Sequence, residues 1–150
     1  MIDGVLIKKL NKIPDERGCI LKMMESSDNE FQGFGEIYFS TVYPGVVKGW
    51  HLHEKAILNY AVIKGMIKLV LFDDRINSVT RGEIQEIFMG DQNYCLVQIP
   101  SQVWNGFKGI GTETAIIADL INCTHNEDIM QRLDPHNNNL IKYDWSRKDR

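Results

Sequence analysis

Short apolar runs that alternate with turn residues make up most of this 150-residue chain. From position 35 to position 121, runs rich in Ile, Val, Tyr, Phe and Thr are separated by Gly, Pro and Asp at intervals of roughly 8–12 residues. This spacing is typical of an all-β sandwich or barrel, and we predict a jelly-roll barrel. The expected strands are Gly35–Tyr43, Ala56–Ile63, Met66–Phe72, Glu83–Met89, Tyr94–Ile99, Val103–Lys108 and Thr114–Ile121.

Only one segment has helical composition. It is the sequence NEDIMQRL after His125, and Pro135 with the polar residues behind it would end a helix there. No repeat, linker or low-complexity tract divides the chain, and 150 residues suit one hydrophobic core. We therefore predict a single domain over residues 1–150, with a short C-terminal helical segment packed against the barrel.

The composition disfavours several classes of protein. Hydrophobic residues at 43% and charged residues at 25% fit a globular domain and not a disordered or fibrous chain. Seventeen basic against 20 acidic residues give a net charge of −3, which disfavours nucleic-acid binding. No apolar run approaches the roughly 18–20 residues of a membrane span, and the N-terminal residues lack the order of a signal peptide. The three cysteines form no CxxC pair, so we expect reduced thiols in a cytoplasmic protein.

The segment from Gly45 to His53 carries the clearest chemical signal. Alternate residues of a strand point to the same side, so His51 and His53 would share one face of an extended segment. Trp50 and Leu52 would then share the opposite, apolar face. Such a strand is either the wall of a concave site or an edge strand with both histidines in solvent.

The same segment resembles the first motif of the cupin superfamily. Four positions match that motif: Gly45, His51, His53 and Gly65. The glutamate of the motif is replaced by Leu58, and the histidine of the second cupin motif is replaced by Asn105. Because a catalytic metal normally takes at least three protein ligands, we predict a site without a metal or other cofactor. Glu54 lies close to the missing glutamate position and keeps a divalent ion as the alternative.

A closer resemblance is to the dTDP-4-dehydrorhamnose 3,5-epimerase family of metal-independent cupins. Six segments resemble the family's motifs in the same order: Asp15–Gly18, Gly45–His51, Asp73–Thr80, Gly90–Pro100, Trp104–Phe107 and Asp134–Trp145. Their shared order is more specific than any single motif. The resemblance implies an enzyme that binds a nucleoside-diphosphate sugar with a 4-keto group and removes a proton from a carbon next to the ketone.

The resemblance also implies catalytic roles. His51 matches the family's general base. Asp149 lies in the sequence Ser146-Arg-Lys-Asp149, which resembles the context of the family aspartate that pairs with the base. The family's acidic tyrosine is absent, and Thr124 or His125 stands at its position. Either His125 takes the acid role or protonation of the second face is lost.

Four further residues are expected to bind the substrate. Arg17 matches an arginine that contacts the nucleotide across the family's dimer, and Asn93 matches a residue that orients the substrate. Lys48 replaces the family's arginine and keeps its charge, while Asn105 replaces a histidine and keeps hydrogen-bonding capacity. The resemblance implies a homodimer in which an N-terminal strand is exchanged between barrels.

Two other functions stay open from the sequence. Nucleotide-sugar 3,4-ketoisomerases, which are also cupin-like, carry an R-G-x-H-x-H segment similar to Lys48-Gly-Trp-His51-Leu-His53. A ketoisomerase would use His51 and His53 together to pass a proton between adjacent carbons. A non-catalytic cupin that only binds a sugar nucleotide is the other alternative, because the tyrosine is missing.

Overall fold

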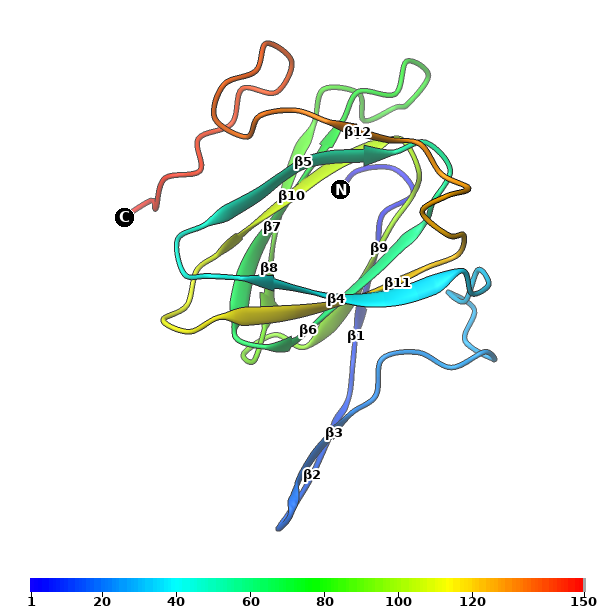
Figure 1. Ribbon diagram of the computed structural model, residues 1–150, viewed down its shortest axis with the longest axis vertical. Helices are drawn as coiled ribbons and strands as arrows, with labels where there is room; N and C mark the ends of the chain where they lie inside the picture. Colours follow the sequence, from blue (N-terminus) through cyan, green and yellow to red (C-terminus); the bar gives the residue numbers. More distant parts are fainter. Residues whose placement is uncertain (150) are drawn as a thin grey trace.

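Two antiparallel β-sheets face each other and form a flattened barrel (Figure 1). The computed structural model describes residues 1–149, and within them the chain forms twelve strands and no helix. One sheet contains, in spatial order, β1 (Leu6–Lys9), β9 (Cys95–Ile99), β6 (Leu58–Lys64), β11 (Ala115–Ile121) and β4 (Glu36–Val42). The other contains β12 (Met130–Arg132), β5 (Val47–His53), β10 (Val103–Gly109), β7 (Met66–Asp73) and β8 (Ile84–Gly90).

The all-β prediction is confirmed, and each of the seven predicted runs forms one strand. These are β4, β6, β7, β8, β9, β10 and β11, and their ends lie within two residues of the predicted ends. Turns form where Gly, Pro and Asp were expected to place them. At the turn between β6 and β7, Gly65 has a φ of +73°, a conformation that favours glycine.

The predicted C-terminal helix is wrong. Residues 130–132 of that segment instead form β12, which pairs with β5 at the edge of its sheet. Trp50 and Leu133 exchange backbone hydrogen bonds of 2.8 and 3.1 Å, which extends the pairing by one residue. A helix of eight residues is only marginally stable by itself, whereas the open edge of β5 supplies backbone partners for an extended chain.

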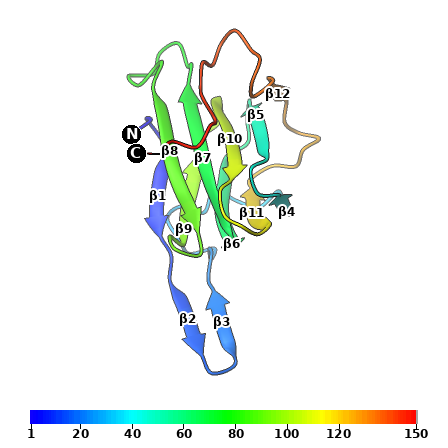
Figure 2. The same ribbon diagram turned by 90° about the vertical axis from the view of Figure 1, so that its left-hand side faces the viewer.

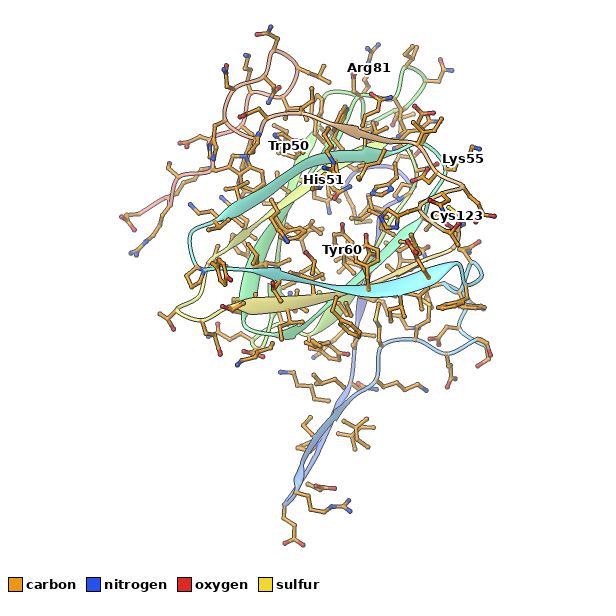
Figure 3. The ribbon with its side chains drawn as sticks, in the orientation of Figure 1. Trp50, His51, Lys55, Tyr60, Arg81 and Cys123 are labelled. Atoms are coloured by element: carbon orange, nitrogen blue, oxygen red, sulfur yellow. The ribbon has the colours of Figure 1, made fainter. Side chains whose placement is uncertain are left out.

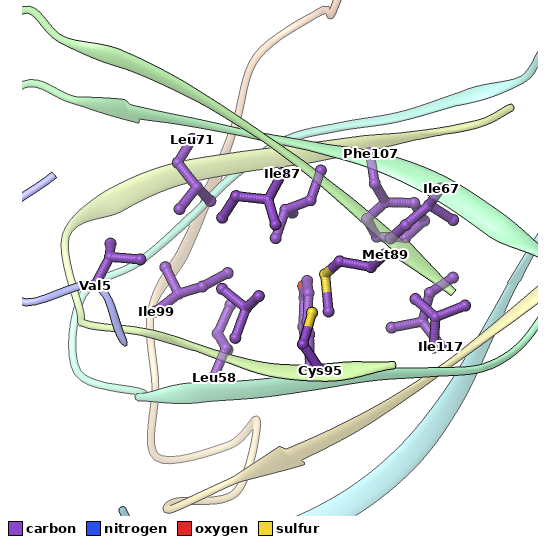
Figure 4. Packing of buried hydrophobic residues seen from close by; sticks show 14 of the residues in the cluster. Val5, Leu58, Ile67, Leu71, Ile87, Met89, Cys95, Ile99, Phe107 and Ile117 are labelled. Carbon is purple, nitrogen blue, oxygen red and sulfur yellow. The ribbon is translucent and has the colours of Figure 1, made fainter. Parts of the chain in front are cut away.

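The hydrophobic core lies between the two sheets. Figure 4 shows side chains from both sheets interdigitating, and every labelled residue in it is buried. Leu58, Cys95 and Ile99 come from one sheet and Leu71, Ile87 and Met89 from the other. Sheet twist and alternating side chains bring these residues together as in other two-layer β folds.

A second apolar cluster covers the outer face of the sheet that contains β5. Trp50 is fully buried there, with its ring centroid 5.1 Å from that of Trp145. Ile141 and Trp145 are also buried, so the C-terminal segment lies on the outside of this sheet. The apolar face predicted for Trp50 and Leu52 is therefore occupied by packing, which leaves the inner face of β5 for other chemistry.

A hairpin of β2 (Lys12–Asp15) and β3 (Gly18–Leu21) projects from the barrel, as Figure 2 shows. Ile13 and Ile20 are direct cross-strand partners in it and are 53% and 65% exposed. No helix that is long and apolar enough to cross a membrane occurs among the residues described.

Candidate active site

A cavity of about 450 Å³ lies between the two sheets. Its walls come from β4, β6 and β11 on one side and from β5, β10 and β12 on the other. Figure 3 shows His51 of β5 and Tyr60 of β6 at the space between the sheets. The titratable side chains that line the cavity are Tyr38, Lys48, His51, His53, Tyr60, Asp119, His125 and Arg132.

Both histidines of β5 face this cavity. The alternation along the strand places His51 and His53 on its inner face, as predicted, and His53 is only 4% exposed. The alternative of two solvated histidines on an outer edge does not match this geometry. The inner face of β5 therefore presents two imidazoles to any molecule that enters the cavity.

A buried carboxylate holds His53. The Nδ1 atom of His53 lies 2.6 Å from Oδ2 of Asp128, and both side chains are almost fully buried. The other oxygen of Asp128 accepts hydrogen bonds from the backbone N–H groups of Lys55 and Ala56. Burial alone would raise the pKa of Asp128, but these hydrogen bonds and the contact with His53 outweigh burial and lower the pKa.

The pairing determines what His53 can do. A carboxylate at Nδ1 favours the tautomer that carries its proton there, so the lone pair lies on Nε2. Sequence reasoning missed Asp128, which is 75 residues from His53 in the chain. The only local signal was an acidic residue in the turn before β12.

Asp149 does not take the partner position that the sequence suggested for it. Its side chain is 77% exposed and forms an ion pair of 2.6 Å with Arg147. The physical reason is the path of the chain, because the segment before it packs on the outer face of the sheet through Trp145. The structure pairs Asp128 with a histidine of the cavity and leaves Asp149 on the surface.

Two cations lie beside His51 in the cavity wall. Lys48 donates hydrogen bonds of 2.9 Å to Oγ of Ser40 and to the backbone oxygen of Thr41. Arg132 of β12 is the cross-strand partner of His51. Burial, assisted by the positive charges of Arg132 and Lys48, lowers the pKa of His51 to about 4. His51 is therefore neutral at neutral pH.

The opposite wall carries a phenol and a carboxyl group in contact. The hydroxyl oxygen of Tyr38 on β4 lies 2.5 Å from Oδ2 of Asp119 on β11. Asp119 is 1% exposed, and its Oδ1 has no hydrogen-bond partner among residues 1–149. Burial raises the pKa of Asp119 to about 7, and burial together with Asp119 raises the pKa of Tyr38. Sequence reasoning missed both residues.

His125 lies at the rim of the cavity. Its side chain is 44% exposed, and its Nδ1 contacts Oε1 of Glu36. The ring centroid of His125 is 5.2 Å from that of Tyr38 and 6.2 Å from that of His53. The structure thus brings His125 near Tyr38 and His53 but holds it at the exposed rim of the cavity.

Of the predicted substrate-binding residues, only Lys48 lines the cavity. Asn105 is fully buried between the two sheets, where its Nδ2 donates to the backbone oxygen of His51 and its Oδ1 accepts from Tyr60. Arg17 is 86% exposed at the turn of the projecting hairpin. Asn93 lies in the turn between β8 and β9 and donates to the backbone oxygen of Phe88.

The candidate metal ligands do not come together. No group of three or more His, Cys, Asp or Glu side chains in the described residues has the arrangement of a metal site. Glu54 accepts a hydrogen bond from Gln131, and Leu58 is buried in the core.

This arrangement of two β-sheets around a cavity lined by imidazole, phenol and carboxyl groups defines a cupin-type barrel. A family model described as dTDP-4-dehydrorhamnose 3,5-epimerase matches residues 1–150. The chain belongs to this family, and the resemblance that its motifs indicated is confirmed. By family, the protein is an isomerase-class carbohydrate epimerase.

Individual proteins are similar over nearly the whole chain. The spore coat polysaccharide biosynthesis protein SpsL of Bacillus subtilis is 33% identical over 147 residues, which cover 97% of each chain. The probable low-salt glycan biosynthesis epimerase Agl13 of Haloferax volcanii is 34% identical over 148 residues, covering 97% of this chain and 95% of its own. The crystal structure of a dTDP sugar isomerase from Desulfovibrio desulfuricans G20 has a TM-score of 0.87 and 36% identity, with 90% of this chain and 87% of that chain covered.

Proposed function

We propose that this protein epimerises a nucleoside-diphosphate 4-keto sugar by removing a proton from a carbon next to the ketone. The observation that carries the proposal is the pair of imidazoles, His51 and His53, in one cavity, with His53 held by buried Asp128. A cavity of about 450 Å³ is of the size that takes a small ligand. The family description and the dTDP sugar isomerase support the substrate class.

In this proposal His51 is the general base. A base must be unprotonated to accept a proton, and the low pKa of His51 keeps it neutral. Burial is the main cause of this low pKa, and the positive charges of Arg132 and Lys48 lower it further. A diphosphate bound beside these two cations would offset their charge and so oppose their part of the pKa shift.

The nucleotide end of the substrate is the part that Arg17 would contact. Arg17 lies on the hairpin that projects away from its own barrel. We propose a homodimer in which this hairpin reaches the neighbouring subunit and Arg17 contacts the nucleotide bound there. Asn93 would orient the substrate from the turn between β8 and β9.

We propose that the reaction takes place in the cytoplasm as part of polysaccharide or glycan biosynthesis. The three cysteines are free thiols, which fits a reducing compartment. The names of SpsL and Agl13 connect those relatives with polysaccharide and glycan biosynthesis.

Deuterium exchange tests this function directly. In D₂O, the protein should introduce deuterium at a carbon flanking the ketone of a dTDP-linked 4-keto-6-deoxyhexose and release the epimer, as followed by NMR. The variant His51→Asn should lose exchange and inversion by about a hundredfold or more, because the base is gone. Exchange no faster than without protein would leave only a sugar-nucleotide-binding cupin, which a binding measurement with the same substrate would detect.

A 3,4-ketoisomerase is the second candidate, and the contact between His53 and Asp128 favours it. That contact prepares a second imidazole to carry a proton between adjacent carbons. The variant His53→Asn separates the two functions, since an epimerase should keep much of its activity and a ketoisomerase should lose it as completely as with His51→Asn. A product with its keto group at C3, identified by NMR, would establish the ketoisomerase.

A further inference from the structure

Inversion at carbon needs proton donors and acceptors on two sides of the sugar. A base removes the proton from one face, and an acid must return a proton to the other. The histidines of β5 occupy one wall of the cavity, and the opposite wall belongs to the other sheet. On that wall β4 and β11 place Tyr38 and Asp119 in contact with each other.

We propose that Tyr38 is the catalytic acid of the second face and that Asp119 is the positioning residue that supplies its proton. This inference rests on the proposed epimerase function. The family's tyrosine lies later in the chain and is absent here. Tyr38 would take its place from β4, a strand on the wall that faces the histidines.

The surroundings of Asp119 indicate a group built to hold a proton. Its carboxyl group is almost fully buried, one oxygen contacts the Tyr38 hydroxyl at 2.5 Å, and the other has no partner in the described part of the chain. A buried carboxylate with an unsatisfied oxygen is costly, whereas the neutral acid avoids most of that cost. The direction of its pKa shift agrees with this.

A protonated Asp119 changes the direction of the contact with Tyr38. The carboxyl O–H then donates to the phenol oxygen, and the phenol O–H is free to point into the cavity. Asp119 cannot itself reach a ligand easily, because its free oxygen is inaccessible to solvent. Tyr38 is only half-buried and lines the cavity, so it is the member of the pair that touches the sugar.

The proton-transfer step balances without any other reactant. As the enolate returns to the ketone, its carbon–carbon π electrons form a new C–H bond with the Tyr38 proton. The Tyr38 O–H bond breaks, and the Asp119 proton moves to the phenol oxygen. Asp119 is left as a carboxylate and takes its proton back through the Tyr38 hydroxyl, which exchanges protons with water in the cavity after the product leaves, while the proton that His51 accepted returns to water.

The other candidate acids are placed less well for this step. His125 is at the exposed rim and contacts Glu36. The Tyr60 hydroxyl is buried and donates to Asn105 at 3.3 Å. Tyr38 lies between them in exposure and is the phenol that contacts a titratable carboxyl group across the cavity from β5.

The experiment compares Tyr38→Phe with a matched variant, Tyr143→Phe. Tyr143 also contacts a carboxylate, Glu86, but it packs on the outer face of the barrel. Both variants remove one hydroxyl and keep the ring, so Tyr38→Phe retains the packing against His125. Each protein is given a dTDP-linked 4-keto-6-deoxyhexose in D₂O, and deuterium exchange and inversion are followed separately by NMR.

Tyr38→Phe should slow inversion by about a hundredfold or more, while exchange with retention stays within about tenfold of the unaltered protein. His51, the proposed base on β5, is unchanged in this variant and can return deuterium to the face of the sugar from which it removed the proton. Tyr143→Phe should change neither rate. Inversion by Tyr38→Phe at the unaltered rate, or equal loss of exchange and inversion, would overturn the assignment.

A second variant, Asp119→Asn, tests the proton supply through the pH profile. If the protonated carboxyl group is needed, kcat of the unaltered protein falls as the pH rises through about 7, and this limb disappears in the variant. The titratable and charged groups that share the cavity with Asp119 are Tyr38, Tyr60 and His125 and, on the opposite wall, Lys48, His51, His53 and Arg132. The same alkaline limb in the variant would assign it to one of those groups and overturn the role of Asp119.

The outcomes also separate this inference from the function on which it rests. Failure of the unaltered protein to exchange deuterium would remove the epimerase function and this assignment with it. Exchange and inversion by the unaltered protein, with Tyr38→Phe still inverting, would leave the epimerase function standing and remove only Tyr38.

Discussion

At the scale of single residues, the candidate site contains two pairs of titratable side chains whose members are distant in the sequence. His53 and Asp128 are 75 positions apart, and Tyr38 and Asp119 are 81 apart. In each pair an aspartate contacts a side chain that can carry a proton: Asp128 contacts His53, and Asp119 contacts Tyr38. His53 and Tyr38 lie on different sheets, so in the proposed epimerase the two pairs would face the sugar from two sides.

The variant Asp128→Asn replaces the buried carboxylate that contacts His53 with a neutral amide. The amide no longer favours a proton on Nδ1 of His53, and an uncharged partner stabilises the imidazolium less. If both histidines act, as in a ketoisomerase, kcat should fall by about a hundredfold or more with little change in KM. If His51 alone is the base, the loss should stay within about tenfold. Steady-state kinetics with NMR identification of the product distinguish the two.

Asp144→Asn is the matched control for that experiment. Asp144 also accepts a backbone N–H, from Ser146, but it lies in the C-terminal segment on the outside of the barrel. Its replacement should leave kcat and KM unchanged. An equal loss in both variants would mean that the effect of Asp128→Asn is a general effect on the fold.

The sequence predicted part of this site and missed the rest for a physical reason. The alternation of β5 was enough to place His51 and His53 on one face, because a strand's period is local. Asp128, Tyr38 and Asp119 enter through strand pairing and loop contacts that no local pattern reports. Aspartates and tyrosines are common in turns and strands, so nothing in their own neighbourhoods marks them as members of the site.

At the scale of elements, the loop between β7 and β8 is held by one buried carboxylate. Asp73 is fully buried and accepts hydrogen bonds from Arg75, Ser78 and Thr80 at 2.5 to 3.0 Å. Arg75 also donates to the backbone oxygen of Asp3, which ties the N-terminal residues to the loop. The residues of the motif at positions 73 to 80 therefore stabilise the loop between β7 and β8 by hydrogen bonds to Asp73.

Asp73→Asn should destabilise the fold by about 3 to 5 kcal/mol, because it leaves Arg75 and two hydroxyl groups without their charged partner. Urea unfolding at pH 7 measures the change. Asp74→Asn is the control, since Asp74 is half-exposed and lies 3.3 Å from Arg81 in solvent; its effect should stay within about 0.5 kcal/mol. Comparable losses in the two variants would contradict the role of Asp73 in holding the loop between β7 and β8.

The stability that Asp73 contributes should depend on pH, and the direction follows from its pKa. Burial opposes ionisation of Asp73, but the hydrogen bonds from Arg75, Ser78 and Thr80 outweigh it and hold its pKa well below the ordinary value. A lowered carboxyl pKa adds stability above the unfolded value near 3.9, and this stability is lost as the pH falls below it. The stability difference between the unaltered protein and Asp73→Asn should therefore narrow between about pH 5 and pH 2.

The elements themselves were largely predictable, except for four short strands. The seven runs from Gly35 to Ile121 are long, β-branched and bounded by turn residues, so local preference and tertiary structure agree. β1, β2 and β3 have only four residues each, too few to show a period, and β2 contains Pro14. β12 has helical composition but pairs with β5, because an open sheet edge outweighs a weak local preference.

At the scale of the whole molecule, the space between the two sheets is divided into an apolar core and a cavity lined by titratable side chains. The core fills the space around β6, β7, β8 and β9, and the cavity opens where β4, β5 and β12 lie. The projecting hairpin belongs to neither part of the barrel. Its two exposed isoleucines, Ile13 and Ile20, stand side by side across the strands.

The homodimer proposal makes this hairpin the element that joins two barrels. Ile13 and Ile20 would be covered by the partner, so the double variant Ile13→Glu with Ile20→Glu should be monomeric where the unaltered protein is dimeric, as measured by light scattering after size-exclusion chromatography. Charged groups in an apolar contact are strongly unfavourable, which is why two changes suffice. Val79→Glu, an equally drastic change at an 89% exposed residue of the β7–β8 loop, should leave the dimer intact.

If Arg17 contacts the nucleotide in the neighbouring subunit, loss of Arg17 and loss of the dimer should both weaken substrate binding. Arg17→Ala should raise KM for the nucleotide sugar with little loss of kcat, because it removes a contact to the nucleotide and leaves the imidazoles in place. The double isoleucine variant should raise KM to a similar degree, since separating the subunits withdraws the same arginine. A monomeric double variant with unaltered KM would show that each barrel binds its substrate alone, and an unaltered protein that is itself monomeric would remove the proposed role of the hairpin.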